Sequence, residues 1–394
     1  MTTILILGVQ FNRMTRAQAR VRLQEFLSDG RQHYIVTPNP EMLVKAQKDF
    51  WFHGILDSAD LSVADGVGVI IASWILGRSL PERIRGTDLL EDLCELAAAQ
   101  KRKVFFLGGK NQSSVERAAD ALQKRYKNLP IVGAEHGPTF TEPAAQFDRG
   151  QFTGVLEKIK QAEPEILVVA FGQGKQEKWI KEFLRELPSV QIAIGVGGAL
   201  DYLSGGARAV PTIMRRFGLE WIWRLIHEPA RLPRIWNAVI VFLWYVILWR
   251  IHLYKPVRQN VLAVITNQEG KYLLADNRRF HKLEGKPHWE FVQGGMERGE
   301  TPEAALYREL EEETGSNSYM ILRQLPFEDY YELPLVHRHR AKRQKIFLVK
   351  FIGAAKELTA TDEIQGFRWV AKDELMTTLH PRRHNVGAKV ILQI

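Results

Sequence analysis

A cluster of acidic residues carries the clearest chemistry in this sequence. The stretch RELEEETG, residues 308–315, contains Glu309, Glu311, Glu312 and Glu313. Like charges three or four positions apart on a helix repel by roughly 0.2–0.5 kcal/mol per pair. At about 100° per residue, Glu309, Glu312 and Glu313 share one helix face, whereas Glu311 points away. The stretch is therefore either a solvated acidic face or a cage for a hard divalent cation, which prefers carboxylate oxygens.

The flanking residues indicate how this cluster is positioned. Thr301 is a favourable N-cap, Pro302 a favourable first helical residue and Gly315 a favourable stop, so a helix is predicted between them. Just upstream, in WEFVQGGMERGE, Gly294 and Gly295 allow the backbone to approach a ligand closely.

The whole segment resembles the Nudix box, G-x5-E-x7-R-E-U-x-E-E-x-G-U, in which U is aliphatic. The matching residues are Gly294, Glu300, Arg308, Glu309, Leu310, Glu312, Glu313 and Gly315. Only the last position departs, because Ser316 stands where an aliphatic residue is expected. We expect that change to affect local packing more than chemistry.

The resemblance implies hydrolysis of a nucleoside diphosphate linked to a further group, with Mg²⁺ or Mn²⁺ as cofactor. Glu309, Glu312 and Glu313 are then the expected metal ligands, and Glu312 and Glu313 are also candidate catalytic residues. Glu300 and Arg308 are expected to form a supporting ion pair. The metal ions would neutralise the diphosphate and activate water for attack on phosphorus.

The stretch beginning HWEFVQGG, followed by KRQKIFLVKF and DEIQGFRWV, is similar to RNA pyrophosphohydrolases and dinucleoside polyphosphate hydrolases. This similarity implies an RNA 5′ end or a dinucleoside polyphosphate as substrate. It makes Glu363 a candidate further ligand or general base, and Arg258 a candidate phosphate contact. Val292 replaces a proline usual in that branch. The basic run HRHRAKRQK, residues 337–345, fits either attraction of RNA or an ordinary solvated loop.

In the first half of the chain, polar or glycine-rich turns follow several apolar runs. The predicted strands are TILILGV, HYIVTP, LSVAD, KVFFLGG, ILVVAFG and IAIGVGG. They alternate with amphipathic helical patterns such as 17–27 and 113–125, which predicts a doubly wound, Rossmann-like α/β domain with a parallel sheet. Ligands bind at the carboxyl ends of such strands. The turns TPNPE, ADGVG, GGKNQ and GQGKQE should therefore line a site.

These turns, taken in order, resemble the WecG/TagA/CpsF glycosyltransferases. The matching stretches are VTPNPEMLVKA, ADGVGVI, PERIRGTDLL, FFLGG, GQGKQEKWI, IGVGGALDYLSGGARAVP and RRFGLEWIWRLIHEPARLPR. The resemblance implies transfer of an N-acetylmannosamine-type sugar from a UDP donor to a polyprenyl-diphosphate-linked sugar, in cell-wall or surface polysaccharide synthesis. No metal or other cofactor is expected for this reaction.

Such a transfer needs a base for the acceptor hydroxyl and cations or dipoles for the departing diphosphate. Asp65 matches the family's base, although an Asp at a strand end also suits capping of the next helix. Thr37 and Asn39 match residues that hold the substrate. Arg83 matches a pocket arginine suited to phosphate, although a lone arginine is commonly a surface residue.

Two further turns carry candidate substrate contacts. Gln176 matches the family's polar turn, in which Gly174 here replaces a proline. Gly195, Gly197 and Gly198 are expected either to face a nucleotide or to permit tight packing of a helix on a strand.

Residues 211–254 differ in character from both flanking regions, because they hold five of the ten tryptophans, interleaved with arginines. The apolar core 235–249 is shorter than the ~20 residues that a spanning helix needs. An interfacial membrane anchor is the preferred interpretation, with a buried helix as the alternative. The family resemblance implies membrane docking here and places Arg215, Arg216 and Arg224 on the acceptor diphosphate.

The bulk composition is that of a globular protein with anionic partners. The 394 residues suggest two or three domains, and the net charge of +9 favours nucleotides, nucleic acid or an acidic membrane surface. Cys94 is the single cysteine, so no internal disulfide forms and a reducing cytoplasm is indicated. Its apolar setting, LLEDLCELAAA, predicts a buried, inert thiol. The start of the sequence lacks the basic region of a signal peptide.

The prediction is a fusion of two enzymes, peripheral on the cytoplasmic face of the membrane. Residues 1–210 form the glycosyltransferase domain, 211–254 the docking segment and linker, and 255–394 an α+β Nudix domain. In that last domain, strands are predicted at NVLAVITN, KYLLADN, KIFLVKF and GFRWV. One alternative makes the Nudix domain a nucleotide sensor without catalysis, and another makes the first domain a binding scaffold.

Overall fold

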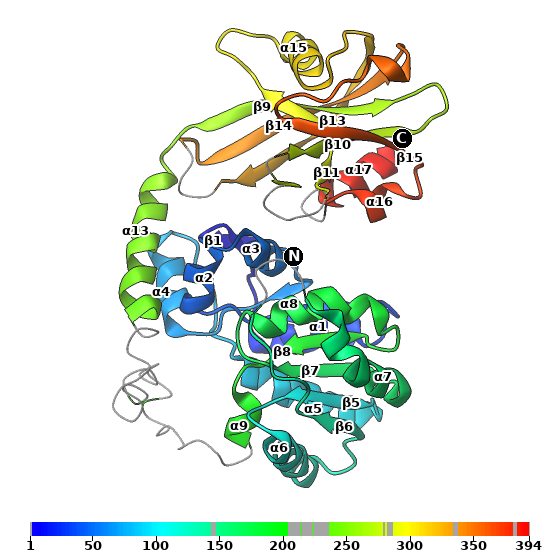
Figure 1. Cartoon of the computed structure of the whole chain (residues 1–394). Helices are drawn as coiled ribbons and strands as arrows, with labels where there is room; N and C mark the ends of the chain where they lie inside the picture. Colours follow the sequence, from blue (N-terminus) through cyan, green and yellow to red (C-terminus); the bar gives the residue numbers. More distant parts are fainter. Residues whose placement is uncertain are drawn as a thin grey trace. The chain divides into compact units, whose positions relative to one another are not determined.

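The computed structural model describes residues 2–142, 147–203, 214, 223, 236–278, 280–281, 287–333, 338–380 and 384–393. The chain divides into two compact units, Met1–Arg250 and Ile251–Ile394 (Figure 1). Three residues predicted to bind substrate, Arg215, Arg216 and Arg224, lie outside the described residues.

The first unit is built on a six-stranded sheet with the strand order β4-β3-β8-β7-β5-β6. All neighbouring strands in it run parallel. The strands are β3 (His33–Val36), β4 (Leu61–Ser62), β5 (Val104–Gly108), β6 (Ile131–Glu135), β7 (Ile166–Ala170) and β8 (Ile192–Gly195). This is the predicted parallel α/β domain. The sequence analysis missed β6, an edge strand whose residues are all half-buried and whose sequence, IVGAE, lacks a continuous apolar run.

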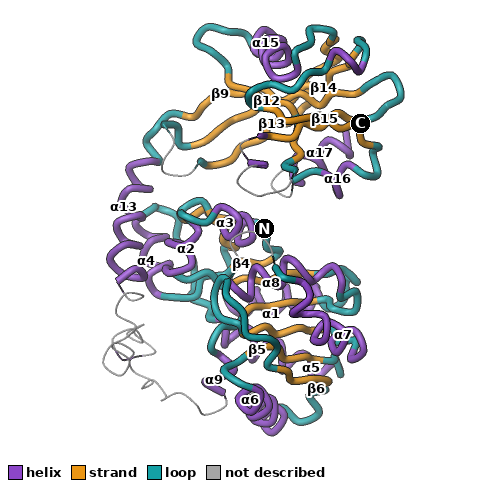
Figure 2. The backbone as a smooth tube through the Cα atoms, viewed as in Figure 1, coloured by secondary structure: helices purple, strands orange, loops and turns teal. Residues whose placement is uncertain are grey.

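Helices cover both faces of this sheet (Figure 2). They are α1 (Arg16–Phe26), α2 (Pro40–Ala46), α3 (Phe50–Asp57), α4 (Val67–Ile75), α5 (Gly86–Gln100), α6 (Gln112–Arg125), α7 (Thr153–Ala162), α8 (Lys175–Phe183) and α9 (Ala199–Leu203). On one face, alternate strand residues such as Ile35 and Val168 share a core with α1, α5 and α6. On the other face, Trp179 and Phe183 of α8 pack against Phe152 with tilted rings. The sheet is therefore buried on both sides, which explains its unbroken apolar strands.

The first predicted strand does not join this sheet. Instead, β1 (Thr3–Ile6) pairs antiparallel with β2 (Val9–Asn12) in a separate two-stranded hairpin. Leu7 and Gly8, with φ of 52° and 82°, make the two-residue turn between them. A turn of this kind requires positive φ at both positions and matches the strand twist. The prediction of a parallel strand was wrong because the Leu-Gly turn pairs this strand with its sequence neighbour, β2, in a local hairpin.

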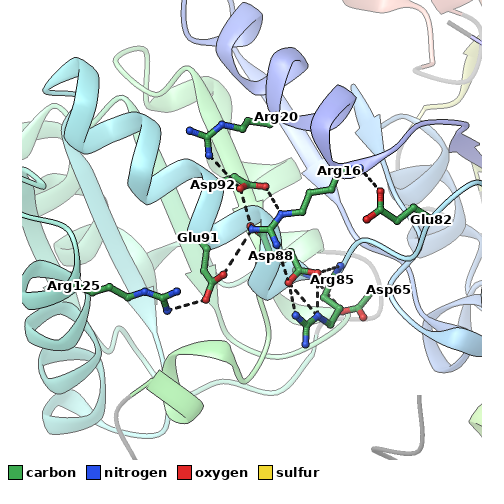
Figure 3. A network of polar contacts seen from close by, with 10 residues as sticks. Arg16, Arg20, Asp65, Glu82, Arg85, Asp88, Glu91, Asp92 and Arg125 are labelled. Carbon is green, nitrogen blue, oxygen red and sulfur yellow. Dashed lines mark hydrogen bonds and ion pairs between the residues drawn. The ribbon is translucent and has the colours of Figure 1, made fainter. Parts of the chain in front are cut away.

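A network of charged residues fastens α1 to α5 (Figure 3). Arg16 donates to both carboxylate oxygens of Asp92, at 2.9 and 3.0 Å, and Arg20 pairs with Glu95 at 2.6 Å. At the start of α5, the backbone N–H of Arg85 donates to Asp88 at 3.0 Å. These contacts hold the segment that leads into α5, where candidate substrate residues lie.

The second unit is built on a seven-stranded sheet with the main order β11-β10-β9-β14-β13, in which β12 also pairs with β9 and β15 with β10. The strands are β9 (Val257–Thr266), β10 (Tyr272–Asn277), β11 (Trp289–Glu290), β12 (Val292–Gly295), β13 (Tyr319–Glu332), β14 (Ala341–Phe351) and β15 (Ile364–Val370). Only β9 and β14 pair in parallel; the other pairs are antiparallel. The sequence analysis missed β13, whose polar and exposed residues resemble a surface segment.

Helices lie on both faces of this sheet as well. One core packs β9, β12 and β14 against α15 (Pro302–Thr314), the helix predicted from its caps. The other core packs the opposite face against α16 (Leu375–Thr378) and α17 (His384–Gln393). The unit is thus the layered α/β domain that the sequence indicated.

The apolar core of the tryptophan-rich segment forms a π-helical turn, Asn237–Val241, followed by α13 (Phe242–His252). Phe242, Val246 and Trp249 are buried. Among the helices that the structure describes, none is long and apolar enough to cross a membrane.

Candidate active sites

Asp65 lies at the carboxyl edge of the first sheet, between β4 and α4. Its Oδ2 accepts a hydrogen bond from the Gly86 N–H at 3.4 Å, and its Oδ1 lies 3.9 Å from Nη2 of Arg83. The residue that caps α4 is Gly66, and no side chain supplies a capping hydrogen bond there. Asp65 therefore does not cap α4. Its carboxylate, about 31% exposed, accepts from the first N–H of α5 and lies beside an arginine.

Thr37 and Asn39 come from the end of the neighbouring strand, β3. A Cβ on Gly86 would lie 3.2 Å from Oγ1 of Thr37 and 4.0 Å from Oδ2 of Asp65. Asn39 caps α2 by accepting from the Met42 N–H at 3.0 Å, and its amide donates to Gln173 at 3.3 Å. The structure thus brings Thr37 and Asp65 together around Gly86, a residue that the sequence analysis did not single out.

Gln176 is buried and hydrogen-bonded both to the turn after β8 and to its neighbour in α8. Its Oε1 accepts from the Gly197 N–H at 2.9 Å, and its Nε2 donates to Glu177 at 2.7 Å. A Cβ on Gly195 would lie 2.6 Å from Nε2 of Gln176. The glycine at 195 therefore serves tight packing, which is one of the two roles left open by the sequence.

Gly174 shows why the usual proline is absent from this turn. Its φ of 85° is closed to proline, whose ring fixes φ near −65°. A Cβ there would lie 2.2 Å from Nζ of Lys45 and 2.6 Å from Oε2 of Glu142. Glycine thus allows the charged pair of Lys45 and Glu142 to close over the turn.

Two buried charged residues near this turn escaped the sequence analysis. Lys178, almost fully buried, lies 2.6 Å from Oδ2 of Asp49 and 3.0 Å from Oε1 of Glu142. Glu177 accepts from the Gly174 N–H at 2.6 Å, and burial raises its pKa to about 7. Both residues follow directly on Gln176, in a stretch whose alternation of charges resembles an ordinary helix surface. No sequence signal marks them as buried.

In the second unit, Arg308 connects the end of strand β12, at Gly295, to the acidic helix α15. It forms a two-point ion pair with Glu300, with both N–O distances at 3.0 Å, and donates to the Gly295 carbonyl at 2.8 Å. The hydrogen bond from Arg308 lowers the pKa of Glu300. Nη1 of Arg308 also donates to Glu309 at 2.8 Å and to Glu312 at 3.1 Å. One guanidinium thus holds the loop and two of the expected ligands.

Gly294 and Gly295 leave space for the side chains of Glu309 and Arg258. A Cβ on Gly294 would lie only 1.7 Å from Cδ of Glu309, and a Cβ on Gly295 would lie 2.1 Å from Nη2 of Arg258. Strand β12 therefore lies directly against the first expected metal ligand at Gly294. It also places Arg258 beside the carbonyl that Arg308 holds.

Negative charges converge on Glu313. Its burial, followed by the charges of Glu290, Glu309 and Glu363, raises its pKa to about 9. Burial likewise raises the pKa of Glu309, to which the charges of Glu312 and Glu363 contribute. Glu363, which lies before β15, is therefore close enough to act on both helix carboxylates.

Glu290 is a further buried carboxylate that the sequence analysis missed. It accepts from the side-chain amides of Asn277 at 2.9 Å and of Gln293 at 2.8 Å. The backbone N–H of Gln293 in turn donates to Glu313 at 3.4 Å. Gln293 thus links Glu290 to Glu313. The sequence feature that could have identified Glu290 is its position four residues before Gly294.

These residues suit a divalent cation by their chemistry. Several carboxylates lie near one another there, and burial, together with repulsion between them, raises the pKa of Glu309 and Glu313. A bound cation would favour the charged form of both groups. As they stand, no three His, Cys, Asp or Glu side chains in the described ranges are close enough to hold one ion. Glu309 and Glu312 are instead hydrogen-bonded to Arg308, so ligation requires those two side chains to turn from it.

The structure also accounts for Ser316 and for part of the basic run 337–345. Ser316 is buried and donates to Glu357 at 3.3 Å, so a hydrogen bond replaces the aliphatic contact of the usual box. From Ala341 onward, the basic run belongs to strand β14 rather than to a loop. Within it, Arg343 lies 3.7 Å from Glu328.

Comparisons with known proteins divide the chain in the same way. Residues 4–256 match the glycosyl transferase WecG/TagA/CpsF family, and residues 256–393 match the NUDIX domain. A relative from Staphylococcus aureus (strain MW2) is 32% identical over 241 residues, which cover 61% of this chain and 90% of the relative. A relative from Bacillus spizizenii is 31% identical over 210 residues, which cover 53% of this chain and 77% of the relative. Both are named N-acetylglucosaminyldiphosphoundecaprenol N-acetyl-beta-D-mannosaminyltransferase.

Among solved structures, the Escherichia coli dihydroneopterin triphosphate pyrophosphohydrolase is 18% identical, with a TM-score of 0.28, and covers 36% of this chain and 100% of its own. A Caenorhabditis elegans Ap4A hydrolase is 19% identical, with a TM-score of 0.28, and covers 34% of this chain and 95% of its own.

Proposed function

The chain belongs to the WecG/TagA/CpsF glycosyltransferase family and carries a NUDIX domain after it, and we propose that it is a bifunctional enzyme. The first unit transfers an N-acetylmannosamine-type sugar from UDP to N-acetylglucosaminyl-diphospho-polyprenol. The second unit hydrolyses a nucleoside diphosphate derivative. Domain boundaries near residues 210 and 255 belong to this proposal.

The observation that carries the transferase proposal is the position of Asp65 at the sheet edge. Its carboxylate is partly exposed and does not cap α4, so it is suited to take the proton from the acceptor hydroxyl. The hydroxyl oxygen then attacks the anomeric carbon as the bond to UDP breaks. Arg83 lies beside this carboxylate, where its charge favours the departing diphosphate. Thr37, Asn39 and Gln176 shape the surrounding turns.

The acceptor diphosphate needs cations of its own. We assign this role to Arg215, Arg216 and Arg224, because their segment follows the sheet and is rich in arginine. The same segment, residues 211–254, is proposed to hold the enzyme at the cytoplasmic face of the membrane. The support is the lipid-linked acceptor in the names of the relatives.

The transferase is tested by UDP release from UDP-N-acetylmannosamine with a polyprenyl-diphosphate-linked acceptor. Asp65→Asn should lower the rate roughly 10²–10⁴-fold, which is the typical contribution of a general base. Binding of the donor, measured by calorimetry, should change little. Asp120→Asn, at an exposed position on α6, is the matched control. If Asp65→Asn released UDP at the wild-type rate, another residue would be the base.

The hydrolase proposal is carried by the convergence of Glu309, Glu313 and Glu363 beside the end of strand β12. Glu309, Glu312 and Glu313 would hold the Mg²⁺ or Mn²⁺. When bound, such a cation supplies neutralisation of the phosphate charge and a more acidic water. Arg258 is placed to contact a phosphate, and Glu363 to accept a proton from water. Arg308 and Glu300 keep the helix and the loop in register.

A substrate panel tests this second activity. It should contain nucleotide sugars, dinucleoside polyphosphates and 5′-triphosphorylated RNA. Metal-dependent phosphate or nucleotide release from at least one member, lost in Glu312→Gln, is the expected result. Release from none of them, with nucleotide binding intact, would favour the sensor without catalysis. The substrate that is hydrolysed also distinguishes two roles of the second unit. Hydrolysis of a nucleotide sugar would indicate a role beside the transferase, whereas hydrolysis of RNA or a dinucleoside polyphosphate would indicate an unrelated role.

A further inference from the structure

Helix α13 is apolar on two opposite faces. One face, with Phe242, Val246 and Trp249, is buried in the first unit. A Cβ on Gly68 would lie 3.7 Å from the Phe242 ring, and a Cβ on Gly8 would lie 3.3 Å from the Trp249 ring. Packing against the domain therefore accounts for this half of the apolar residues only.

The other face of the same segment is exposed. Its residues recur at helical spacing and are large: Ile240, Leu243, Trp244 and Ile247. Trp244 is 59% exposed. A solvated helix normally carries polar residues on its outer face, so this second apolar stripe needs another explanation.

Helix α4 presents a similar stripe. Ile71, Trp74 and Ile75, at helical spacing, are exposed, and Trp74 is 62% exposed. The two helices meet where Gly68 of α4 lies against Phe242, and Figure 1 draws them next to each other. We call the seven exposed residues on the two helices the α4–α13 face: Ile71, Trp74, Ile75, Ile240, Leu243, Trp244 and Ile247.

Helix α4, which carries part of this face, begins next to the candidate base. Asp65 lies two residues before the first residue of α4, Val67. A ligand whose polar head reaches Asp65 and whose tail is apolar would therefore have an exposed apolar helix directly beside it. The face is continuous in sequence with the catalytic turn.

The charged residues next to the face in sequence are cations. No acidic residue occurs between Asp65 and Glu82, where Arg78 is the one charged side chain. On α13, the charged residue within the first unit is Arg250, which is exposed. Exposed tryptophans with flanking cations are the pattern of a helix that lies in the interface of an anionic bilayer.

We propose that the α4–α13 face rests on an anionic lipid leaflet, with α4 as a second membrane-contacting helix beside α13, and that the prenyl chain of the acceptor enters the leaflet along α4. This inference rests on the proposed transferase function and adds to it the surface that meets the lipid. It extends membrane contact from the tryptophan-rich segment to the helix that follows the candidate base. The prenyl chain then stays in lipid while its diphosphate reaches Asp65.

The single buried cysteine permits a direct test. Because Cys94 is almost fully buried and burial raises its pKa to about 12, a thiol dye should react with an introduced cysteine instead. Trp74→Cys and Trp244→Cys, made in the full chain and labelled with a polarity-sensitive dye, report on the two helices. Val21→Cys, at an exposed position on α1, is the matched control.

On phosphatidylcholine vesicles containing phosphatidylglycerol, the dye emission should shift to the blue at positions 74 and 244 but not at position 21. The shift should weaken on vesicles without phosphatidylglycerol. In sedimentation with the anionic vesicles, Trp74→Gln combined with Ile75→Gln should lower binding roughly tenfold or more, since two interfacial apolar side chains are lost. An unshifted dye at position 74 would remove α4 from the membrane surface.

A second outcome would also overturn the proposal. If position 74 shifts without vesicles, and light scattering shows a dimer that the Trp74→Gln and Ile75→Gln pair dissociates, the face joins two copies of the chain. Failure of the transferase proposal looks different. UDP release with a water-soluble, short-chain acceptor should survive the Trp74→Gln and Ile75→Gln pair, and its absence in the wild type would count against the function alone.

Discussion

Among the individual residues, Glu177 shows what burial does to a carboxyl group in the first unit. Its pKa is raised by burial from an ordinary 4.5 to about 7, although the amide of Gln176, the Gly174 N–H and Lys45 all favour its charged form. Between these two values the folded chain keeps a proton that the unfolded chain has lost. The contribution of Glu177 to the free energy of unfolding is therefore fully present below about pH 4.5 and is lost as the pH rises through about 7.

Glu177→Gln should remove that dependence. Relative to wild type, the variant should gain stability on going from pH 5 to pH 8, by roughly 3 kcal/mol at most for a shift of this size. Urea unfolding followed by tryptophan fluorescence, with Trp179 buried in the same helix, measures it. Glu157→Gln, exposed on α7, should differ from wild type equally at both pH values. If Glu177→Gln also differed from wild type equally at both pH values, burial would not raise the pKa of Glu177 as described.

Glu290 is the residue in the second unit whose role the sequence did not reveal. Two side-chain amides hold it, and Gln293 links it to Glu313. Glu290→Gln removes one negative charge from this cluster and changes the partner of Gln293, so the affinity for Mn²⁺ should fall roughly tenfold or more. Calorimetric titration of the full chain with Mn²⁺ measures this directly. Glu311→Gln, exposed on the same helix as Glu313, should titrate like wild type. An unchanged affinity in Glu290→Gln would leave Glu290 a structural residue only.

Residue types and spacing predicted many of the candidate site residues but not their neighbours. Thr37, Asp65 and Arg83 were found because each follows a strand or lies in a recognisable stretch. Gly86, Glu177, Lys178 and Glu290 were not, because their burial depends on contacts between segments far apart in the chain. Gly86 meets Asp65 across twenty-one positions, a proximity that no local pattern encodes.

At the scale of elements, glycine positions decide how closely the acidic helix approaches the sheet. Gly294 of β12 leaves no space for a Cβ beside Glu309 of α15. Gly294→Ala should therefore displace the Glu309 side chain, lower the Mn²⁺ affinity more than tenfold and destabilise the second unit by roughly 1–3 kcal/mol, as overpacking usually does. Calorimetry and thermal unfolding measure the two effects.

Gly366 of β15 provides the control for that substitution. A Cβ there would meet no atom within 4 Å, so Gly366→Ala should bind Mn²⁺ and unfold like wild type. If Gly294→Ala behaves in the same way, the close approach of β12 and α15 does not govern the metal site.

The elements themselves were predicted where one local signal dominates. The caps Thr301, Pro302 and Gly315 gave the bounds of α15, and apolar runs gave the buried parallel strands. Prediction failed for β6 and β13, which have mixed burial, and for β1, where the Leu7–Gly8 turn determines the partner. Which strand a segment pairs with is a long-range property, and short segments carry little information about it.

At the scale of the whole molecule, two compact units each carry a separate set of chemical groups. The carboxylate of Asp65 belongs to the first, and Glu309, Glu312 and Glu313 belong to the second. The sequence indicated this division through its change from parallel-strand runs to an acidic box. It gave no reason for the fusion, since no residue pattern states which substrate the second unit removes.

The most direct measurement assays both reactions in one preparation of the full chain and in two variants. UDP release and metal-dependent phosphate release are followed under the same conditions in wild type, Asp65→Asn and Glu312→Gln. We predict that Asp65→Asn loses UDP release and keeps phosphate release, whereas Glu312→Gln does the reverse. Loss of both reactions in either variant, or of neither in both, would contradict the account of two independent active sites.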